Sequence, residues 1–193
     1  MNTREHILEQ IKQNKPASGQ LPDIPSFAGR YPSLIETFVV QADLAGSTTF
    51  LISDHREISD HIDRKFPNAG QIISCIEGFK GSFELSEQMS PRDLQPIDVA
   101  VISSSLGVAE NGTVWLTEED CQLRILPFIT QHLVVVIAAK NIVENMHHAY
   151  QKLKTDETGF GVWAGGPSKT ADIEQTLVVG AQGARSLNIL IIK

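Results

Sequence analysis

The segment 165–186, GGPSKTADIEQTLVVGAQGARS, combines residue types that can bind a small anion. Two adjacent glycines let backbone N–H groups approach a bound group closely, and a helix start presents unpaired N–H donors to negative charge. Hydroxyl side chains follow the glycines, and an arginine near the end of the segment can clamp a carboxylate. The sequence therefore predicts a ligand site with the candidate residues Gly165, Gly166, Pro167, Ser168, Thr170, Asp172 and Arg185.

The same segment also has a purely structural interpretation. Asp172 and Gln175 have the spacing of a capping box, and the glycines can simply permit a tight turn. Asp172 and Glu174 suit a helix start without any ligand, and their charges would oppose a phosphate. Arg185 is equally compatible with a surface role. Both interpretations predict a helix that begins at Thr170 or Asp172.

A second stretch, LGVAENGTVWLT at 106–117, places a carboxylate at a turn between apolar segments. Asn111-Gly112 is a turn signal, and Gly112 permits a left-handed backbone beside Glu110. A carboxylate presented there into a cleft could have a raised pKa or act as a nucleophile. The alternative is that Glu110 is a solvated hairpin acid. Gly112 and Thr113 join the candidate ligand site, and Glu110 is a candidate catalytic residue.

Other kinds of site find little support. His147 and His148 are adjacent on an expected helix, and His55 and His61 are six residues apart, so neither pair shares a helix face for a metal. The chain has two cysteines, which are too few for an iron–sulfur cluster of about four thiolates. We expect both thiols, Cys75 and Cys121, to be core residues.

Composition narrows the classes of function. The chain has 193 residues, 41% hydrophobic content and a net charge of −7, which fits a single globular domain and disfavours nucleic-acid binding. Its apolar runs are shorter than the roughly 20 residues of a membrane helix. The N-terminal MNTREHILEQ lacks the apolar core of a signal peptide. We therefore expect a cytoplasmic protein.

The pattern of elements predicts how the two stretches are positioned. Residues 1–32 read as a capped helix followed by a proline-rich linker, and residues 33–193 alternate between helices and short Val/Ile-rich strands. Such strands are buried on both faces, so we expect an α/β domain with a mostly parallel sheet and helices on both faces. Ligands of such sheets bind beyond the carboxyl ends of the strands, where we expect both stretches to lie.

Further expectations concern single elements. Asp54 should cap a helix over residues 55–66, Asn141 should open a helix that reaches about Lys154, and a helix should follow Asp172. The segment 77–96 lacks periodicity and resembles an exposed loop.

The chain resembles the lactate-utilisation protein C family, the LUD domain. The run GPSKTADIE at 166–174 matches a family segment of the form SGPS-[RK]-TADIE, with Gly165 in place of the usual small hydroxyl residue. The family segment A-[ED]-T-G-T corresponds to residues 109–113, with Asn111 in place of threonine, and the usual HGP turn is reduced to residues 182–184. The resemblance extends from about Ser33 to the C-terminus.

The resemblance implies a fold, a pathway and partners. The fold would be the one shared by ribose-5-phosphate isomerase, glucosamine-6-phosphate deaminase and the CoA transferases. The function would be as a subunit in the oxidation of L-lactate to pyruvate, with a small carboxylate or other anion as ligand. Two partner subunits would carry the iron–sulfur clusters, and this chain would bind no cofactor alone.

A second resemblance supports an alternative function. The run AENGTV at 109–114 is similar to the S-E-N-G segment of class I CoA transferases, whose glutamate forms a thioester with CoA. Glu110 would then be the nucleophile of an acyl-transfer enzyme. Those enzymes usually need two such units, whereas this chain supplies one. A third interpretation is a scaffold with no ligand.

Overall fold

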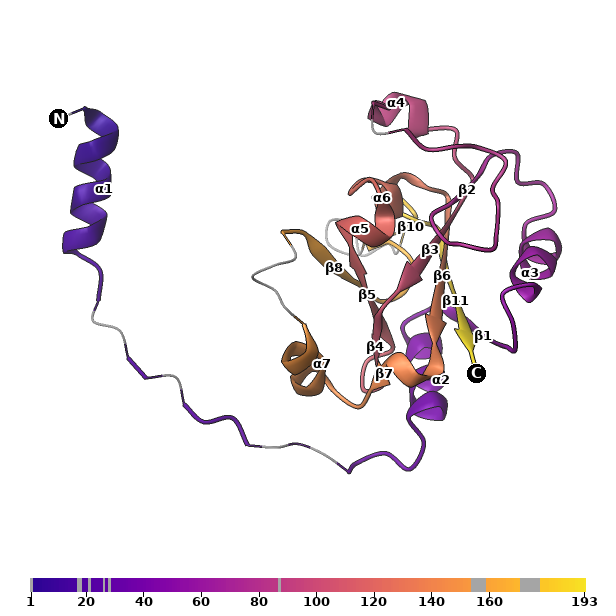
Figure 1. Cartoon of the computed structure of the whole chain (residues 1–193), viewed down its shortest axis with the longest axis horizontal. Coiled ribbons are helices and arrows are strands. Elements are labelled where there is room, and N and C mark those ends of the chain that lie inside the picture. Colours follow the sequence, from indigo (N-terminus) through magenta and orange to yellow (C-terminus); the bar gives the residue numbers. More distant parts are fainter. Residues whose placement is uncertain are drawn as a thin grey trace.

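The computed structural model describes residues 2–16, 19–20, 22–25, 27, 29–86, 88–153, 159–170 and 178–193. Its centre is a five-stranded sheet in which every strand is parallel to its neighbours (Figure 1). The strands are β1 (Thr48–Ile52), β2 (Ile72–Ser74), β3 (Val99–Ser104), β6 (His132–Ala138) and β11 (Ser186–Ile192), in the order β1-β11-β6-β3-β2. This confirms the predicted parallel α/β architecture.

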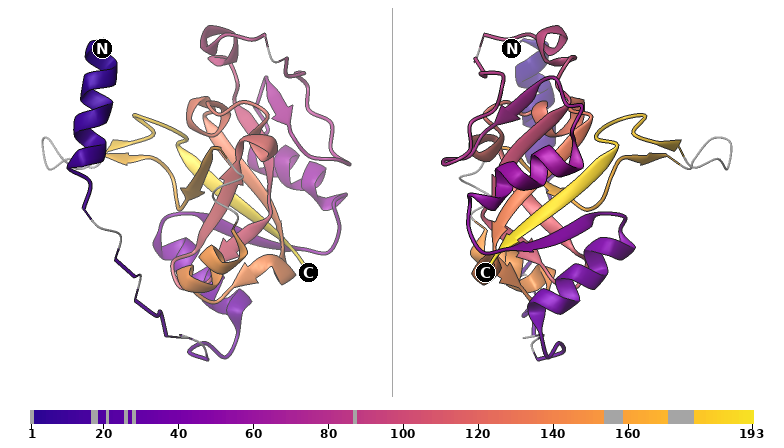
Figure 2. Two further views of the ribbon diagram at one scale, coloured as in Figure 1. Left: turned by 60° about the vertical axis from the view of Figure 1, so that its left-hand side comes forward. Right: turned by 90° about the vertical axis from the view of Figure 1, so that its right-hand side faces the viewer.

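A second, smaller sheet was not anticipated from the sequence. It has the order β7-β4-β5-β8, formed by β7 (Ile142–Val143), β4 (Leu106–Val108), β5 (Thr113–Thr117) and β8 (Gly161–Ala164). β4 and β5 form the predicted hairpin around Asn111-Gly112, and β8 runs antiparallel to β5. A two-stranded antiparallel pair, β9 (Lys169–Thr170) and β10 (Val178–Val179), extends from the domain (Figure 2).

The described helices are mostly short. They are α1 (Thr3–Gln13), α2 (Leu34–Leu44), α3 (Glu57–Lys65), α4 (Pro91–Leu94), α5 (Glu118–Cys121), α6 (Leu126–Ile129) and α7 (Met146–Lys152), with a 3-10 turn η1 (Ala139–Asn141). None of the helices in this part of the chain combines the length and the apolar character that a membrane crossing requires.

The two faces of the central sheet are covered differently. On one face Ile58 and Ile62 of α3 pack against Val99 and Val134 of the sheet. On the other face lie α2 and the smaller sheet. Phe38 of α2 is completely buried in a cluster with residues of both sheets. Truncating Phe38 to alanine would cost about 3–5 kcal/mol of folding free energy.

The N-terminal helix lies apart from the domain (Figure 1). Asn2 and Glu5 form the predicted capping box, and α1 has no buried residue. The linker is tied to the domain near its end, because Glu144 accepts hydrogen bonds from the amides of Gly29 and Arg30. The side chain of Phe27 also stacks on His147 with ring centroids 4.6 Å apart. The boundary between residues 32 and 33 stays a prediction.

Three expectations about single elements were wrong. α3 begins at Glu57, two residues later than expected, although the Asp54 carboxylate accepts from the amide of Arg56 and also pairs with its guanidinium. The helix expected from Asn141 begins at Met146, because Ile142 and Val143 pair with β4 and Asn145 supplies the cap. Segment 77–96 contains α4, and its Phe83 packs on the core and forms a bridge to β2.

The prediction of a helix that begins at Thr170 or Asp172 is wrong for the ends of the segment that the structure describes. Thr170 lies in a strand, and Val178 pairs with it in antiparallel register. Backbone pairing therefore gives Thr170 itself an extended rather than a helical conformation. Residues 171–177 lie outside the described part of the chain, so the middle of the expected helix is not placed.

Gly112 lets the β4–β5 turn pack directly against the backbone of α2. Its φ is +66°, and a Cβ built on it would lie 2.2 Å from the backbone nitrogen of Ala42 in α2. We expect Gly112→Ala to lower the free energy of unfolding by about 3 kcal/mol, through strain and overpacking. Gly159→Ala is the matched control, because Gly159 has φ +52° but open space around its Cβ position. Urea unfolding with equal losses in both variants would refute this packing argument.

The contact between Glu144 and the linker should depend on pH. The amides of Arg30 and Gly29 donate to the carboxylate and hold its pKa below the ordinary value of 4.5. A depressed pKa means that the contact stabilises the fold above pH 4.5 and is lost as the pH falls through the lower, folded-state pKa. In acid, the NMR chemical shifts of these two amides should therefore move toward the values of amides that are not bonded to Glu144. The Glu144→Ala variant should have these shifted values already at neutral pH, whereas the control variant Glu84→Ala should keep the native values.

Candidate functional site

The predicted Gly-Gly-Pro-Ser segment forms one wall of a pocket of about 300 Å³, which we call the turn pocket. Its floor is apolar, with side chains from α6, β6, β8 and β11. The lining residues are Pro127, Phe128, Leu133, Val162, Trp163, Ala164, Gly165, Gly166, Pro167, Ser168, Lys169, Gln182, Gly183, Ala184 and Leu187. A pocket of this size accepts a small molecule.

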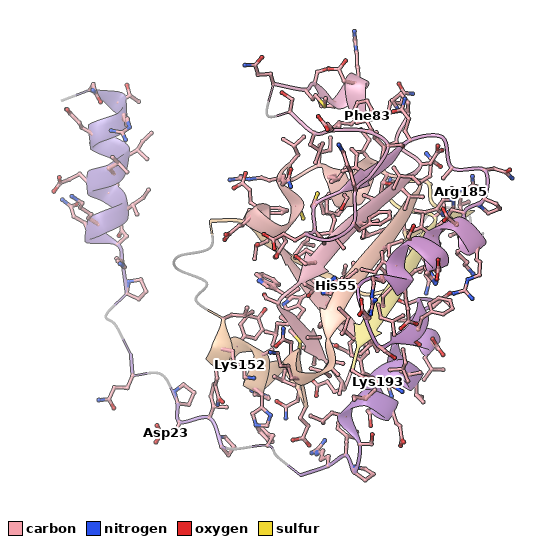
Figure 3. All side chains as sticks on the ribbon, turned by 45° about the vertical axis from the view of Figure 1, so that its right-hand side comes forward. Asp23, His55, Phe83, Lys152, Arg185 and Lys193 are labelled. Atoms are coloured by element: carbon pink, nitrogen blue, oxygen red, sulfur yellow. The ribbon has the colours of Figure 1, made fainter. Side chains whose placement is uncertain are left out.

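The turn pocket lies at the amino ends of the central strands, whereas we expected it at their carboxyl ends. Leu133 and Leu187 are the second residues of β6 and β11, so the pocket is at the amino ends of these strands. Figure 3 labels Arg185 and Lys193 at the two ends of β11 and so shows how far apart the two edges lie. The expectation failed because the glycine turn follows β8, which belongs to the smaller sheet.

The two glycines of the turn are pressed against neighbouring backbone and side chains. Gly166 has φ +90°, and a Cβ there would lie 2.2 Å from the carbonyl oxygen of Ala45, just after α2. A Cβ on Gly165 would lie 2.7 Å from Cγ2 of Thr113. The structural interpretation of these glycines therefore has a physical basis, since they allow close packing within the protein.

The backbone amides of the turn divide into two groups. The amide of Ser168 donates to the carbonyl of Ala184 at 2.8 Å, so it is not available to a ligand. The amides of Gly165 and Gly166 have no hydrogen-bond partner among the described residues. The Ser168 hydroxyl accepts from the amide of Gln182 at 3.3 Å and retains its own proton as a donor. Two amides and one hydroxyl can therefore bind an acceptor.

Lys169 is the one charged residue among the described lining residues of the turn pocket. Its ammonium donates to the carbonyl of Ala45 and so satisfies a carbonyl at the end of α2. An ammonium has three N–H donors, so this bond leaves two of them. A carboxylate bound by the turn would thus meet a fixed cation.

The remaining candidates of the first segment lie elsewhere. Arg185 is exposed, does not line the turn pocket, and lies near His132, whose pKa is lowered by burial and then by this arginine. Thr170 is in β9, one residue beyond the lining. Asp172 lies outside the described residues. Of the candidate residues predicted in the first segment, the pocket lining therefore includes Gly165, Gly166, Pro167 and Ser168.

No candidate of the second stretch lines the turn pocket, although Thr113 supports the turn from behind. Thr113 contacts Gly165, and Gly112 packs on α2, so both lie behind the turn rather than in the pocket lining. Glu110 points to α7, where its carboxylate accepts a hydrogen bond from the amide of Met146 at 2.8 Å. Its own amide donates to the carbonyl of Glu144. This geometry assigns Glu110 a role in positioning α7.

The two cysteines are neighbours in space although they are distant in sequence. The Cys75 thiol donates to the carbonyl of Cys121 at 3.6 Å. Burial raises the pKa of each thiol to about 12, so neither forms a thiolate near neutral pH. No cluster of three or more His, Cys, Asp or Glu side chains suited to a metal occurs within the described ranges.

The sequence arguments missed a larger pocket, of about 690 Å³, at the carboxyl ends of the central strands. Its polar side chains include His55, Glu77, Ser103 and Asn141. The available signal was the position of each residue at or just after a predicted strand, which is where ligands of such sheets bind. The glycine-rich segment 165–168, by contrast, lies at the amino ends of the strands.

Comparisons with known proteins agree on one family. The family model of the LUD domain matches residues 3–192. A protein named Lactate utilization protein C from Bacillus pumilus is 32% identical over 115 residues, covering 56% of this chain and 48% of the relative. One of that name from Oceanobacillus iheyensis is 28% identical over 101 residues, covering 49% and 43%. The matched segments thus span less than half the length of these curated relatives.

A longer but weaker match and a solved structure complete the comparison. Lactate utilization protein C from Anoxybacillus flavithermus is 25% identical over 163 residues, covering 75% of this chain and 74% of the relative. The crystal structure of a DUF162 family protein from Deinococcus radiodurans has a TM-score of 0.61 at 16% identity. It covers 83% of this chain and 96% of that chain. At this identity the likeness shows the fold alone, and it supports the α/β architecture described above.

Substitutions of Glu110 separate its structural role from a nucleophilic one. Glu110→Gln keeps a carbonyl oxygen that can accept from Met146, so we expect its stability to stay within about 0.5 kcal/mol of the native chain. Glu110→Ala should lose about 1–2 kcal/mol in urea unfolding because the bond disappears. Equal destabilisation by both variants, or an acyl adduct on Glu110 after incubation with acyl-CoA and borohydride, would contradict this assignment.

Proposed function

Because this chain belongs to the LUD domain family, we propose that it takes part in lactate utilization by binding a small monocarboxylate in the turn pocket. The matching relatives named Lactate utilization protein C support the pathway. The ligand would be L-lactate, pyruvate or a similar 2-hydroxy or 2-oxo acid. The chain would act as one subunit of a complex with iron–sulfur partners.

One observation carries the ligand part of the proposal. The unpartnered amides of Gly165 and Gly166 border a small apolar pocket whose lining includes Lys169, with its ammonium bonded to the nearby carbonyl of Ala45. A carboxylate accepts hydrogen bonds from adjacent amides and is attracted by a nearby cation. The methyl group of lactate would contact apolar side chains such as Phe128 and Leu187. The apolar floor would exclude water, which strengthens the polar contacts.

The cysteine content supports the proposed division of labour. Oxidation of lactate to pyruvate releases two electrons and two protons, and the electrons need an acceptor. A cluster needs about four thiolates, whereas this chain has two cysteines whose thiols stay protonated. In this proposal the partner subunits carry the clusters, and this chain binds and orients the organic acid.

Titration of the ¹⁵N-labelled chain with sodium L-lactate tests the ligand site. The amide signals of Gly165 and Gly166 should shift in a saturable way, and lactamide, which lacks the charge, should shift them much less. Lys169→Met should weaken the affinity about tenfold, because it removes about 1.4 kcal/mol of attraction. Lys80→Met is the control, since Lys80 is an exposed lysine paired with Glu84. No shift of either glycine at about 50 mM lactate would exclude the turn pocket as the site.

The assembled complex tests the pathway. Lactate-dependent dye reduction should fall when Ser168→Ala and Thr170→Ala are combined, provided that the variant still assembles with its partners. The loss should appear mainly as a raised KM if the segment binds substrate. Unchanged kinetics in an intact complex would remove this segment from the reaction, even if the chain remains a subunit.

A further inference from the structure

The larger pocket, which we call the carboxyl-edge pocket, is lined by residues of the three central strands and of the segments that follow β1 and β2. His55 follows β1, the segment 75–78 follows β2, and Ser103 lies near the end of β3. β6 and β11 contribute the last part of their strands. The lining residues are His55, Cys75, Ile76, Glu77, Gly78, Ser103, Ser104, Val136, Ala138, Asn141 and Ile192. Ligands of parallel sheets bind beyond this edge.

Loops from the two outermost strands meet over this pocket. β1 and β2 are the two outermost strands of the sheet, on opposite sides of the three central strands. Nevertheless, the residues that follow them are in contact, since a Cβ built on Gly78 would lie 3.9 Å from Cβ of His55. His55 is labelled in Figure 3. The two loops therefore converge above the ends of the three central strands and give the pocket a wall that the strands alone would not provide.

The polar groups of the pocket divide into satisfied and free ones. The Ser104 hydroxyl bonds to the carbonyls of Leu106 and Trp115, and the Cys75 thiol bonds to Cys121. By contrast, the side chains of four lining residues form no hydrogen bond with any residue that the structure describes: His55, Glu77, Ser103 and Asn141. These four side chains can therefore bind a ligand without breaking a contact of the fold.

The charge of the lining restricts the class of ligand. It includes one carboxylate, one imidazole and no lysine or arginine among the described residues. A phosphate or a CoA pyrophosphate would find no cation and would face Glu77. Hydroxyl groups suit the pocket better, because Glu77 accepts, while Ser103 and Asn141 both donate and accept. Val136 and Ile192 offer apolar surface to a carbon skeleton.

We infer that the carboxyl-edge pocket binds a small uncharged molecule that carries several hydroxyl groups, such as a polyol or a monosaccharide. The site lies at the opposite strand ends from the turn pocket and differs from it in charge, because the lining of the turn pocket includes Lys169. The inference concerns a second ligand and does not depend on the lactate proposal.

NMR titration of the ¹⁵N-labelled full chain with erythritol and with D-xylose tests this site. At least one probe should shift the amides of Gly78, Ser103 and Asn141 in a saturable way up to about 100 mM, which would detect a Kd of about 10 mM. Gly165 and Gly166 should not move, so the outcome is distinct from that of the lactate titration. No saturable shift with either probe would overturn the inference, as would a saturable shift of the same amides with sodium phosphate.

Variants identify the groups responsible. The double variant Ser103→Ala and Asn141→Ala should weaken probe binding at least about tenfold. Asn68→Ala, at an exposed asparagine outside this pocket, should leave it unchanged. If the double variant does not fold, His55→Ala replaces it, because His55 is exposed and its loss should still weaken binding severalfold. Undiminished binding in the folded variant would overturn the site.

Discussion

Close packing of two glycine-bearing turns against the end of α2 organises this domain. Gly112 packs against the backbone of Ala42, and Gly166 packs against the carbonyl of Ala45. Both contacts are so close that a Cβ would not fit. The ammonium of Lys169 then bonds to that same carbonyl. These contacts place the residues next to Gly166 at the mouth of a pocket, so the geometry of the turn pocket is set by a helix end rather than by a ligand.

The two edges of the central sheet offer different chemistry. The amino edge has the turn pocket, with free amides, an apolar floor and a cation. The carboxyl edge has a larger pocket with hydroxyl, amide, imidazole and carboxylate groups but no lysine or arginine among the described lining residues. The three central strands between them, β3, β6 and β11, are mostly buried and apolar. A parallel sheet of this kind can hold two unlike ligands apart without any change in its core.

The main sheet was predictable from the sequence, whereas its partner sheet was not. Runs such as 133–137 are apolar throughout, which is typical of strands buried on both faces. β7 has two residues and β9 has two, and such short strands form through pairing with neighbours rather than through a pattern of their own. The pocket at Gly165 and Ser168 was predicted, but its location depended on β8 joining the smaller sheet, which no local signal reveals. The site assignment itself stays a prediction.

The central claim is that the amides of Gly165 and Gly166 bind a carboxylate at the mouth of the turn pocket. A crystal structure of the chain grown with pyruvate tests it most directly. The account predicts a carboxylate oxygen about 2.9 Å from each of these two nitrogens, with the organic group against Phe128. A map in which both amides bond to protein atoms, and side chains fill the pocket, would contradict it.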